Sequence, residues 1–231
     1  MPPLINPMRH LEIEFAGYTI IADISGALYI PDEKILVVAD LHFGKGMRLA
    51  AGGALVPPYD LQATLHRLEK LIRSYRPETI VSLGDGFDDL DSLNRLSATD
   101  RHYLITITNS TNWIWISGNH DPTPVAEAGG DTMNELKIAK LTLRHEANHD
   151  EREAEISGHF HPKARVTVRG RSQVRRCFVT NGTRTILPAF GSYTGGLDVT
   201  DPAISGLFGS SFDALVLGDR KLYRISSARI S

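Results

Sequence analysis

The stretch 113–122, WIWISGNHDP, decides how the rest of this chain is interpreted. Its first four residues are apolar and lead directly into small and polar residues. An apolar run of that length, ended by turn-forming residues, is typical of a buried strand that delivers its tip to a loop. The tip carries the amide of Asn119, the imidazole of His120 and the carboxylate of Asp121. Taken alone, this tip is most simply a polar turn after a core strand.

The same pattern, an apolar run followed by residues that can ligate a metal, occurs four more times. The runs begin at Ile35, Ile80, Leu141 and Ile156. They end, respectively, in Asp40 and His42; in Asp85, Asp88 and Asp89; in His145; and in His159 and His161. Asp, Asn and His all bind divalent metals through oxygen or imidazole nitrogen. Because ligands gather at one end of the strands in sheets that carry sites, we expect the five strand ends to converge.

Length and composition are those of an ordinary globular protein. The chain has 231 residues, of which 42% are hydrophobic and 23% charged. Without repeats or an obvious linker, we expect one domain over residues 1–231. No apolar run approaches the roughly 20 residues that span a membrane, the N-terminus lacks the regions of a signal peptide, and the single cysteine, Cys177, excludes an internal disulfide. These features favour a cytoplasmic location without a membrane partner, and Cys177 is expected to be a packed residue.

Charge is distributed unevenly along the chain. The formal net charge is −2, yet residues 156–197 contain no Asp or Glu. That segment holds seven basic residues: Lys163, Arg165, Arg169, Arg171, Arg175, Arg176 and Arg184. Across 163–169 the basic residues alternate with apolar ones, which predicts the exposed face of a strand that turns into a hairpin at Gly170. The stretch indicates an anionic partner, although a merely solvated face is the alternative.

Between the first two ligand-bearing segments lie a glycine-rich stretch and a helix. Residues 44–58 are expected to form a loop that could fold over a ligand, with Lys45 and Arg48 meeting phosphate; a flexible solvent loop explains it almost as well. Asp60 is a good N-cap for a helix whose apolar positions share one face. A second, weaker helix is expected between Asp89 and about Thr106. Strands and helices that alternate in this way predict an α/β protein in the first half, and the second half is expected to be mostly strands.

Seven residues form the candidate ligand set. They are Asp40, His42, Asp85, Asn119, His145, His159 and His161. This number exceeds the need of one ion and suits two, with Asp85 bridging. Two ions about 3.5–4 Å apart clamp a phosphate and generate hydroxide near neutral pH. Nitrogen and oxygen ligands without thiolate suit Mn, Fe or Zn.

The order of these motifs resembles the calcineurin-like metallophosphoesterase superfamily. Asp-x-His, Gly-Asp, Gly-Asn-His-Asp, a lone His and Gly-His-x-His follow one another across residues 40–161. The resemblance implies an α/β fold, an αββα sandwich of two central mixed β-sheets flanked by helices. It implies that one ion is held by Asp40, His42, Asp85 and His161, and the other by Asp85, Asn119, His145 and His159. It also implies that His120 protonates the leaving oxygen and that Asn119 helps to hold the phosphate.

A narrower resemblance covers most of the chain. Residues 40–45 (DLHFGK), 158–162 (GHFHP) and 187–197 (LPAFGSYTGGL) look like the bacterial ligase-associated DNA-damage-response endonuclease family. That resemblance implies a manganese-dependent nuclease acting on single-stranded DNA, in a repair gene cluster with a DNA ligase and a helicase. The family usually carries His where this chain has Asp88. In the wider superfamily an Asp at this spacing commonly orients the histidine of the Asn-His pair, so we expect a hydrogen bond from His120 to the Asp88 carboxylate; helix capping is the alternative.

Together these features predict a two-metal phosphodiesterase, most simply a single-strand DNA endonuclease. His120, Asn119 and Asp88 are the predicted catalytic residues. The residues predicted to bind the substrate are Lys45, Arg48, Arg165, Arg169 and Arg171. One alternative is a hydrolase of small phosphate compounds, such as a nucleotide pyrophosphatase or phosphomonoesterase, which would not need the basic stretch. Another is a metal-free binding scaffold, against which the complete ligand set stands.

Overall fold

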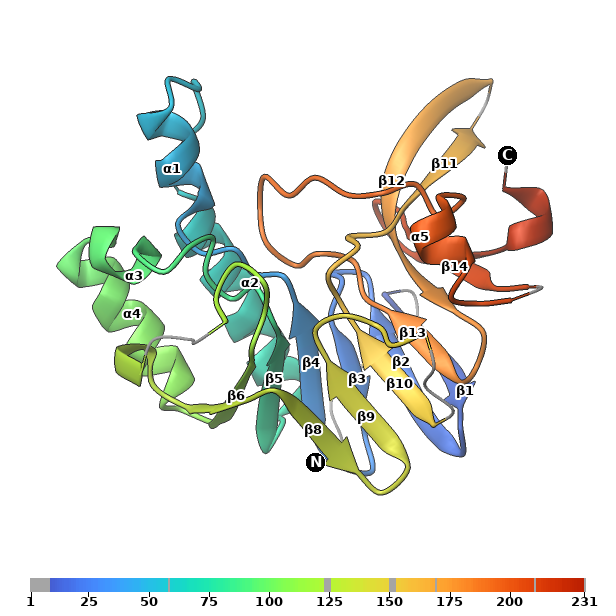
Figure 1. Ribbon diagram of the computed structural model, residues 1–231, viewed down its shortest axis with the longest axis horizontal. Helices are drawn as coiled ribbons and strands as arrows, with labels where there is room; N and C mark the ends of the chain where they lie inside the picture. Colours follow the sequence, from blue (N-terminus) through green and yellow to red (C-terminus); the bar gives the residue numbers. More distant parts are fainter. Residues whose placement is uncertain are drawn as a thin grey trace.

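Two β-sheets packed face to face form the centre of the protein (Figure 1). The computed structural model describes residues 9–57, 59–122, 126–149, 153–168, 170–209 and 211–230. The first sheet has the order β1 (His10–Phe15), β2 (Tyr18–Asp23), β3 (Leu28–Ile30), β4 (Ile35–Ala39), β5 (Thr79–Leu83), β6 (Asn112–Ile116) and β7 (Asp131–Met133). Strands β1 to β4 are antiparallel, whereas β4 to β7 run parallel.

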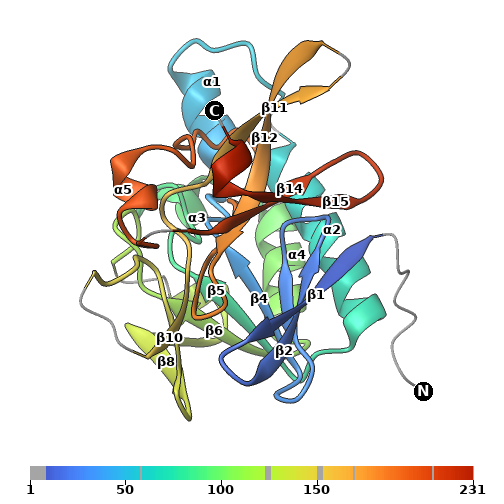
Figure 2. The ribbon, with the colours of Figure 1, turned by 90° about the vertical axis from the view of Figure 1, so that its right-hand side faces the viewer.

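The second sheet is also mixed. Its order is β15 (Leu222–Ser226), β14 (Asp213–Leu217), β12 (Arg171–Thr180), β13 (Arg184–Ile186), β10 (Ala154–Ser157), β9 (Leu141–Arg144) and β8 (Glu135–Ile138). Strands β9, β10 and β13 are parallel to one another. Among the described strands, β11 (Lys163–Val168) pairs with β12, and the two project from the sheet as a hairpin (Figures 1 and 2). Lys163 also forms a bridge with Asp198.

Burial explains why the parallel strands read as continuous apolar runs. All five residues of β4 are buried. Val37 and Ala39 belong to the core between the sheets, whereas Leu36 and Val38 belong to the core beneath the helices. A strand covered on both faces has no solvent side, so it shows no polar alternation.

Helices cover mainly one outer face. Helices α2 (Asp60–Tyr75) and α4 (Ala98–Thr108) pack on the first sheet, with α1 (Lys45–Ala51) and α3 (Ser92–Arg95) at its upper edge (Figure 1). Over the second sheet lie the short α5 (Pro202–Ser205) and the segment around Phe208 and Phe212. The expected sandwich of two mixed sheets is confirmed, with fewer helices on the second face than on the first. None of the described helices is long and apolar enough to cross a membrane.

Three local predictions were wrong. The glycine-rich segment is not all loop, since Lys45–Ala51 form α1 between Gly44 and Gly52. Asp60 does not cap α2: Tyr59 holds that position, and the buried Asp60 carboxylate accepts the Gly46 amide at 3.1 Å, which ties α1 to α2. The predicted second helix is divided into α3 and α4, because Ser97 caps a new start by accepting the Asp100 amide.

Candidate metal centre

The ligand-bearing strand ends of both sheets meet at one place (Figure 1). Asp40, Asp85 and Asn119 follow the parallel strands β4, β5 and β6. His145 and His159 follow the parallel strands β9 and β10 of the other sheet. Parallel neighbours end at the same edge of a sheet, so each sheet delivers its residues from one edge. The predicted convergence is thereby realised.

The backbone at the ligands is unusual. Five of the seven have a positive φ: Asp40 (54°), His42 (46°), Asp85 (45°), His159 (70°) and His161 (49°). Residues other than glycine adopt this left-handed region uncommonly, at a cost on the order of 1–3 kcal/mol each, and such strain clusters at functional sites. The fold therefore keeps an unfavourable backbone where it turns these side chains inward.

Asp40, His42 and His161 form the first group of facing ligand atoms, all within 4.8 Å of one another. Nε2 of His42 lies 3.3 Å from Nε2 of His161, and the latter lies 3.3 Å from Oδ1 of Asp40. Asp40 and His42 are buried and His161 is half-buried. The group is thus largely shielded from solvent.

Asp85, His145 and His159 form the second group. Oδ1 of Asn119 lies 2.9 Å from Nε2 of His145 and 3.0 Å from Nδ1 of His159. Oδ2 of Asp85 lies 3.6 Å from Nε2 of His145 and 3.9 Å from Nε2 of His42. Asp85 is therefore placed between the two groups, as a bridging carboxylate would be.

Hydrogen bonds to backbone groups orient these ligands. Nδ1 of His145 donates to the Leu83 carbonyl at 3.0 Å, which leaves the Nε2 lone pair directed into the centre. The His159 amide donates to Asp40 Oδ2 at 3.0 Å, and the His120 amide donates to Asp85 Oδ1 at 2.9 Å. The His159 amide also lies 3.2 Å from Oδ1 of Asp40, so it is shared between the two oxygens, whereas Oδ2 of Asp85 remains directed at the centre.

The glycines of the motifs make room for these contacts. A Cβ on Gly118 would lie 2.2 Å from the Asp85 amide nitrogen, and one on Gly84 would lie 2.3 Å from Nδ1 of His145. Both distances are far shorter than a carbon can approach. The Gly-Asp and Gly-Asn-His-Asp motifs therefore need glycine for close packing of the ligands.

Two imidazoles of the centre are held neutral. Burial lowers the pKa of His42 below its ordinary value, although Asp88 opposes the shift. Burial, followed by the neighbouring His145, lowers the pKa of His159. A metal binds the neutral imidazole, so both shifts favour ligation at neutral pH.

The arrangement fits two divalent ions. With Nδ1 donating to the Leu83 carbonyl, the neutral form of His145 presents the lone pair of Nε2 to the Asn119 oxygen, so that two acceptors face each other. Such facing lone pairs repel each other unless a cation lies between them. Carboxylate, amide and imidazole donors without sulfur match Mn, Fe or Zn.

His120 meets Asp88 in a way that the sequence did not predict. Nδ1 of His120 donates to the backbone carbonyl of Asp88 at 2.9 Å. The Asp88 carboxylate instead faces α1, where it contacts Lys45 Nζ at 3.3 Å, the Arg48 guanidinium, and His42 Nδ1 at 3.5 Å. The predicted bond from His120 to that carboxylate was wrong. The capping alternative is not seen either, since Asp91 holds the N-cap position of α3.

The charge of Asp88 is stabilised by these partners. Burial opposes ionisation, but the bonds from His42 and Arg48 and the charges of Lys45 and Arg48 hold the pKa of Asp88 well below its usual range. The side chain is fully buried. Lys45 and Arg48, predicted to contact substrate, therefore form an ion-paired cluster with Asp88 behind the His42 ligand.

Asp121 is a buried residue that holds the loop after β5. It is 1% exposed, and its Oδ2 accepts the Phe87 amide at 3.0 Å. Burial raises the pKa of Asp121 to about 6. The residue holds the loop that carries Asp85, and the Gly-Asn-His-Asp motif was the only signal for it.

The basic stretch is divided by the fold. Arg165 is exposed and Ala164 is buried, as the alternation predicted. Arg171 is also exposed, whereas Arg169 lies outside the described residues. The expectation of a uniformly exposed basic face was wrong for Arg184. It is 8% exposed and bonded to Glu155 Oε1 at 3.0 Å, because β13 runs inside the sheet.

The fold and this centre define a phosphoesterase that uses divalent metals. Residues 33–200, more than half of the chain, match the calcineurin-like phosphoesterase family model. The chain belongs to the calcineurin-like phosphoesterase family and is a metal-dependent phosphoesterase. No curated protein sequence matches it.

Solved structures give a second comparison. The crystal structure of Pseudomonas putida nuclease MPE is similar at a TM-score of 0.75 and 25% sequence identity, over 94% of this chain and 100% of that chain. YfcE, a phosphoesterase from E. coli, gives a TM-score of 0.40 at 13% identity, over 83% of this chain and 97% of its own. Vacuolar Protein Sorting 29 from Cryptosporidium parvum gives 0.34 at 16%, over 84% and 95%. The last two scores are too low to support a conclusion.

Proposed function

We propose that the chain is a two-metal phosphodiesterase that cleaves single-stranded DNA internally. The observation that carries the diesterase chemistry is the pair of ligand groups on either side of Asp85, with His120 beside them. The nucleic acid substrate is supported by the similarity to Pseudomonas putida nuclease MPE, which extends over nearly the whole of both chains.

The assigned ligand roles are those the sequence predicted. Asp40, His42, Asp85 and His161 would hold one ion, and Asp85, Asn119, His145 and His159 the other. Bound ions would polarise the phosphate and supply a nucleophile at neutral pH. We propose Mn as the metal, with Fe or Zn as alternatives of the same donor preference.

His120 is the proposed general acid. Its ring lies 5.1 Å from the ring of His42, and the residue is exposed. The Asp88 carbonyl accepts the Nδ1 proton, which fixes the ring and leaves Nε2 to carry the transferable proton. That proton passes to the leaving sugar oxygen as the P–O bond breaks, so that an alkoxide does not have to depart.

The biological setting completes the proposal. By the resemblance stated above, the enzyme acts in DNA repair in the cytoplasm of a bacterial cell, in functional association with a DNA ligase and a helicase. Residues 1–231 are proposed to form one domain, in keeping with the core shared by the two sheets. Arg165, Arg169 and Arg171 remain the proposed contacts of the β11–β12 hairpin with DNA.

One experiment separates the candidate substrates. The metal-loaded protein is incubated with circular single-stranded DNA, p-nitrophenyl phosphate and bis(p-nitrophenyl) phosphate. Linearisation of the circle is expected, together with faster hydrolysis of the bis-ester than of the monoester. Hydrolysis of the small esters with an intact circle would favour the other candidate, a phosphoesterase of small compounds.

A further inference from the structure

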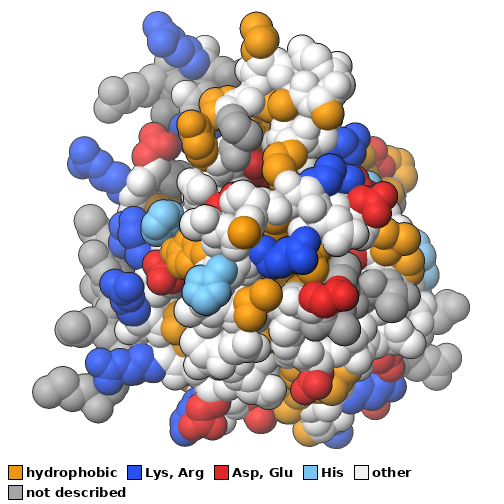
Figure 3. Space-filling model, turned by 90° about the vertical axis from the view of Figure 1, so that its left-hand side faces the viewer, with side chains coloured by type: hydrophobic (Ala, Val, Ile, Leu, Met, Phe, Trp, Pro, Cys, Tyr) orange, Lys and Arg blue, Asp and Glu red, His pale blue; other side chains and the backbone are white. Residues whose placement is uncertain are grey.

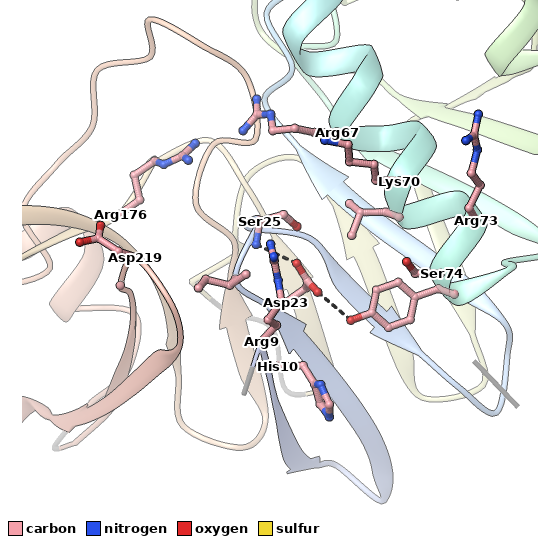
Figure 4. Close-up of a pocket in the computed structure, with 14 residues that line it drawn as sticks. Arg9, His10, Asp23, Ser25, Arg67, Lys70, Arg73, Ser74, Arg176 and Asp219 are labelled. Atoms are coloured by element: carbon pink, nitrogen blue, oxygen red, sulfur yellow. Dashed lines mark hydrogen bonds between the residues drawn. The ribbon is translucent and has the colours of Figure 1, made fainter. Parts of the chain in front are cut away.

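A cavity of about 680 Å³ lies between α2, the start of β1 and the turn joining β14 to β15 (Figure 4). Its wall carries five cationic side chains and two carboxylates. These are Arg9, Arg67, Lys70, Arg73 and Arg176 against Asp23 and Asp219. Figure 4 shows Arg67 and Lys70 on α2 across the cavity from Arg176 on β12. The cavity belongs to neither of the ligand groups described above.

Both carboxylates are engaged by other groups. Asp23 accepts the Tyr75 hydroxyl and the Ser25 amide, each at 2.8 Å. Asp219 accepts Nη1 of Arg175 at 2.9 Å. Within the described ranges, four of the five cations form no ion pair, and Arg73 reaches Glu69 only at 3.9 Å. The cavity therefore has a surplus of positive charge.

Arg67 and Arg176 are held in place by backbone carbonyls. Arg67 donates to the Phe190 carbonyl at 2.6 Å and lies over the Phe190 ring, 4.5 Å from its centroid. Arg176 donates to the Ala189 carbonyl at 2.8 Å. Burial, followed by the charge of Arg176, lowers the pKa of Arg67 to about 10, so Arg67 still carries its charge at neutral pH. Burial also lowers the pKa of Arg176. Two fixed, partly desolvated guanidinium groups are a preorganised receptor for phosphate oxygens.

A second cavity, of about 430 Å³, shares these two arginines. Its other lining residues include Lys163, Tyr193 and Thr194. It lies next to the metal centre, because the Gly191 amide donates to the Asp40 carbonyl at 3.1 Å and Lys163 follows His161 by two residues. Arg67 and Arg176 thus stand between a cavity beside the centre and a larger one along α2.

Tyr193 adds a feature that a receptor for a small anion does not need. Its side chain is 40% exposed, and its φ of 57° is rare for an aromatic residue. Its hydroxyl donates to the Pro57 carbonyl at 3.0 Å, which anchors the ring across the segment that follows α1. Proteins that bind single-stranded nucleic acids combine aromatic rings, on which bases stack, with cations that bind the phosphate backbone.

We infer that the two cavities form one track for a single nucleic acid strand, with Arg67 and Arg176 binding backbone phosphate and Tyr193 stacking on a base. Arg9 and Lys70 extend the track along α2. The inference rests on the proposed nuclease function and adds to it a path that the sequence did not predict. In Figure 3, Lys and Arg side chains gather along one edge of the face shown.

The test uses two exposed cations and one aromatic residue. The side chains of Arg9 and Lys70 make no hydrogen bond or ion pair with any residue that the structure describes, so the double substitution Arg9→Gln/Lys70→Gln should leave the fold intact. Lys137→Gln/Lys140→Gln removes the same charge from β8 and the turn after it, and is the control for charge; Lys137 differs in pairing with Glu135 at 3.4 Å on the surface. Each pair, as well as Tyr193→Ala and Tyr193→Phe, is placed in a metal-loaded His120→Ala background so that DNA persists during the measurement.

Binding of a fluorescent 20-nucleotide single strand is measured by anisotropy at several salt concentrations. Loss of two phosphate contacts should make the slope of log K against log salt shallower by about 1.4, at roughly 0.7 per phosphate. Tyr193→Ala should weaken binding by roughly 5- to 150-fold, the range for one stacked base, whereas Tyr193→Phe should retain most of it. The control pair should keep the slope of the parent.

Each outcome decides the matter. If the Arg9/Lys70 pair and the control pair give equal slopes while the parent binds DNA, the track is overturned and the nuclease proposal stands. If the pair weakens binding of thymidine monophosphate as much as that of the 20-nucleotide strand, the cavity is a small-phosphate site and the track is again overturned. If the wild-type protein hydrolyses bis(p-nitrophenyl) phosphate, but neither the wild type nor the His120→Ala parent binds DNA, the nuclease proposal itself fails.

Discussion

His120 and Asp88 meet through the ring of one and the backbone of the other: Nδ1 of His120 lies 2.9 Å from the Asp88 carbonyl oxygen. The side chain at position 88 can therefore change without removing the partner of the histidine. The Asp88 carboxylate serves a different purpose, since it joins α1 to the rear of the His42 ligand.

Replacing His120 by Ala should slow diester cleavage while the metals stay bound. We expect a loss of roughly 10²–10⁴-fold on DNA, as is typical of a missing general acid. The loss should be much smaller on bis(p-nitrophenyl) phosphate, whose leaving group needs little protonation. Steady-state rates on both substrates, with metal content measured in parallel, check this. Equal losses on the two substrates would remove the acid role.

Asp88→Asn should destabilise the metal-free protein and should leave the proposed general-acid role of His120 intact. Loss of charge-assisted bonds to Lys45 and Arg48 should lower the free energy of unfolding by about 1–3 kcal/mol at pH 7. Because the folded-state pKa of Asp88 is depressed, its contribution is present above the ordinary carboxyl pKa and is lost as pH falls below it. Thermal unfolding in EDTA should show that the difference in stability between wild type and variant is smaller at pH 3 than at pH 7. A stability difference that increased at pH 3 would contradict a depressed pKa for Asp88.

Asp85→Ala should cost both ions, because Oδ2 of Asp85 lies between His42 and His145. His159→Ala should mainly empty the site that it shares with Asn119. Metal analysis of purified protein is expected to give close to none for the first variant and about one ion for the second. His102→Ala, on the exposed surface of α4, is the matched histidine control. A full complement of two ions in Asp85→Ala would disprove the bridging assignment.

Gly118→Ala should disturb the centre more than an alanine elsewhere. Its Cβ would lie 2.2 Å from the Asp85 amide, so the two ligand loops must separate. We expect a loss of about 1–3 kcal/mol in unfolding free energy, as for overpacked cores, together with weaker metal binding. Gly195→Ala, where a Cβ meets nothing within 4 Å, provides the control for stability. Similar melting temperatures for the two variants would show that the site is less tightly packed than it looks.

Cys177 should be chemically silent in the folded protein. It is fully buried on β12, and burial raises the pKa of its thiol far above neutral. The thiolate is the reactive form, so a disulfide reagent such as DTNB should react only after denaturation. Rapid labelling of the native protein would show that β12 opens readily.

The sequence predicted the strand ends because each is a local signal. An apolar run that ends in Asp, Asn or His needs no long-range information, and β4 and β6 appeared where the runs at Ile35 and Trp113 lay. The direction of Asp88 was missed because residue order does not say whether a carbonyl or a carboxylate faces a neighbour. The direction of the Asp88 carboxylate depends on the position of Lys45 and Arg48 in α1. The glycines of this segment predicted a loop there instead of a helix.

The placement of charged side chains was predicted less well than the strand ends, for a related reason. A run of basic residues does not reveal which of them turn inward. Arg184 is buried against Glu155, and Arg176 lies half-buried beside α2, which is more than a hundred residues earlier in the chain. The α2 cations at 67, 70 and 73 have ordinary helical spacing, so nothing in the sequence marked them as one wall of a cavity.

The candidate ligands come from both sheets, so metal binding by all of them would tie metal supply to the lifetime of the folded chain. Asp40, Asp85 and Asn119 belong to one sheet, whereas His145 and His159 belong to the other. Ions bound by all of them would act as cross-links between the sheets, and any opening that separates the sheets would have to release those ions. A ligand that binds only the native state stabilises it by RT ln(1 + [L]/Kd), about 2.7 kcal/mol at a hundredfold excess over Kd. A cell short of the metal would then lose the protein to proteolysis as well as its activity.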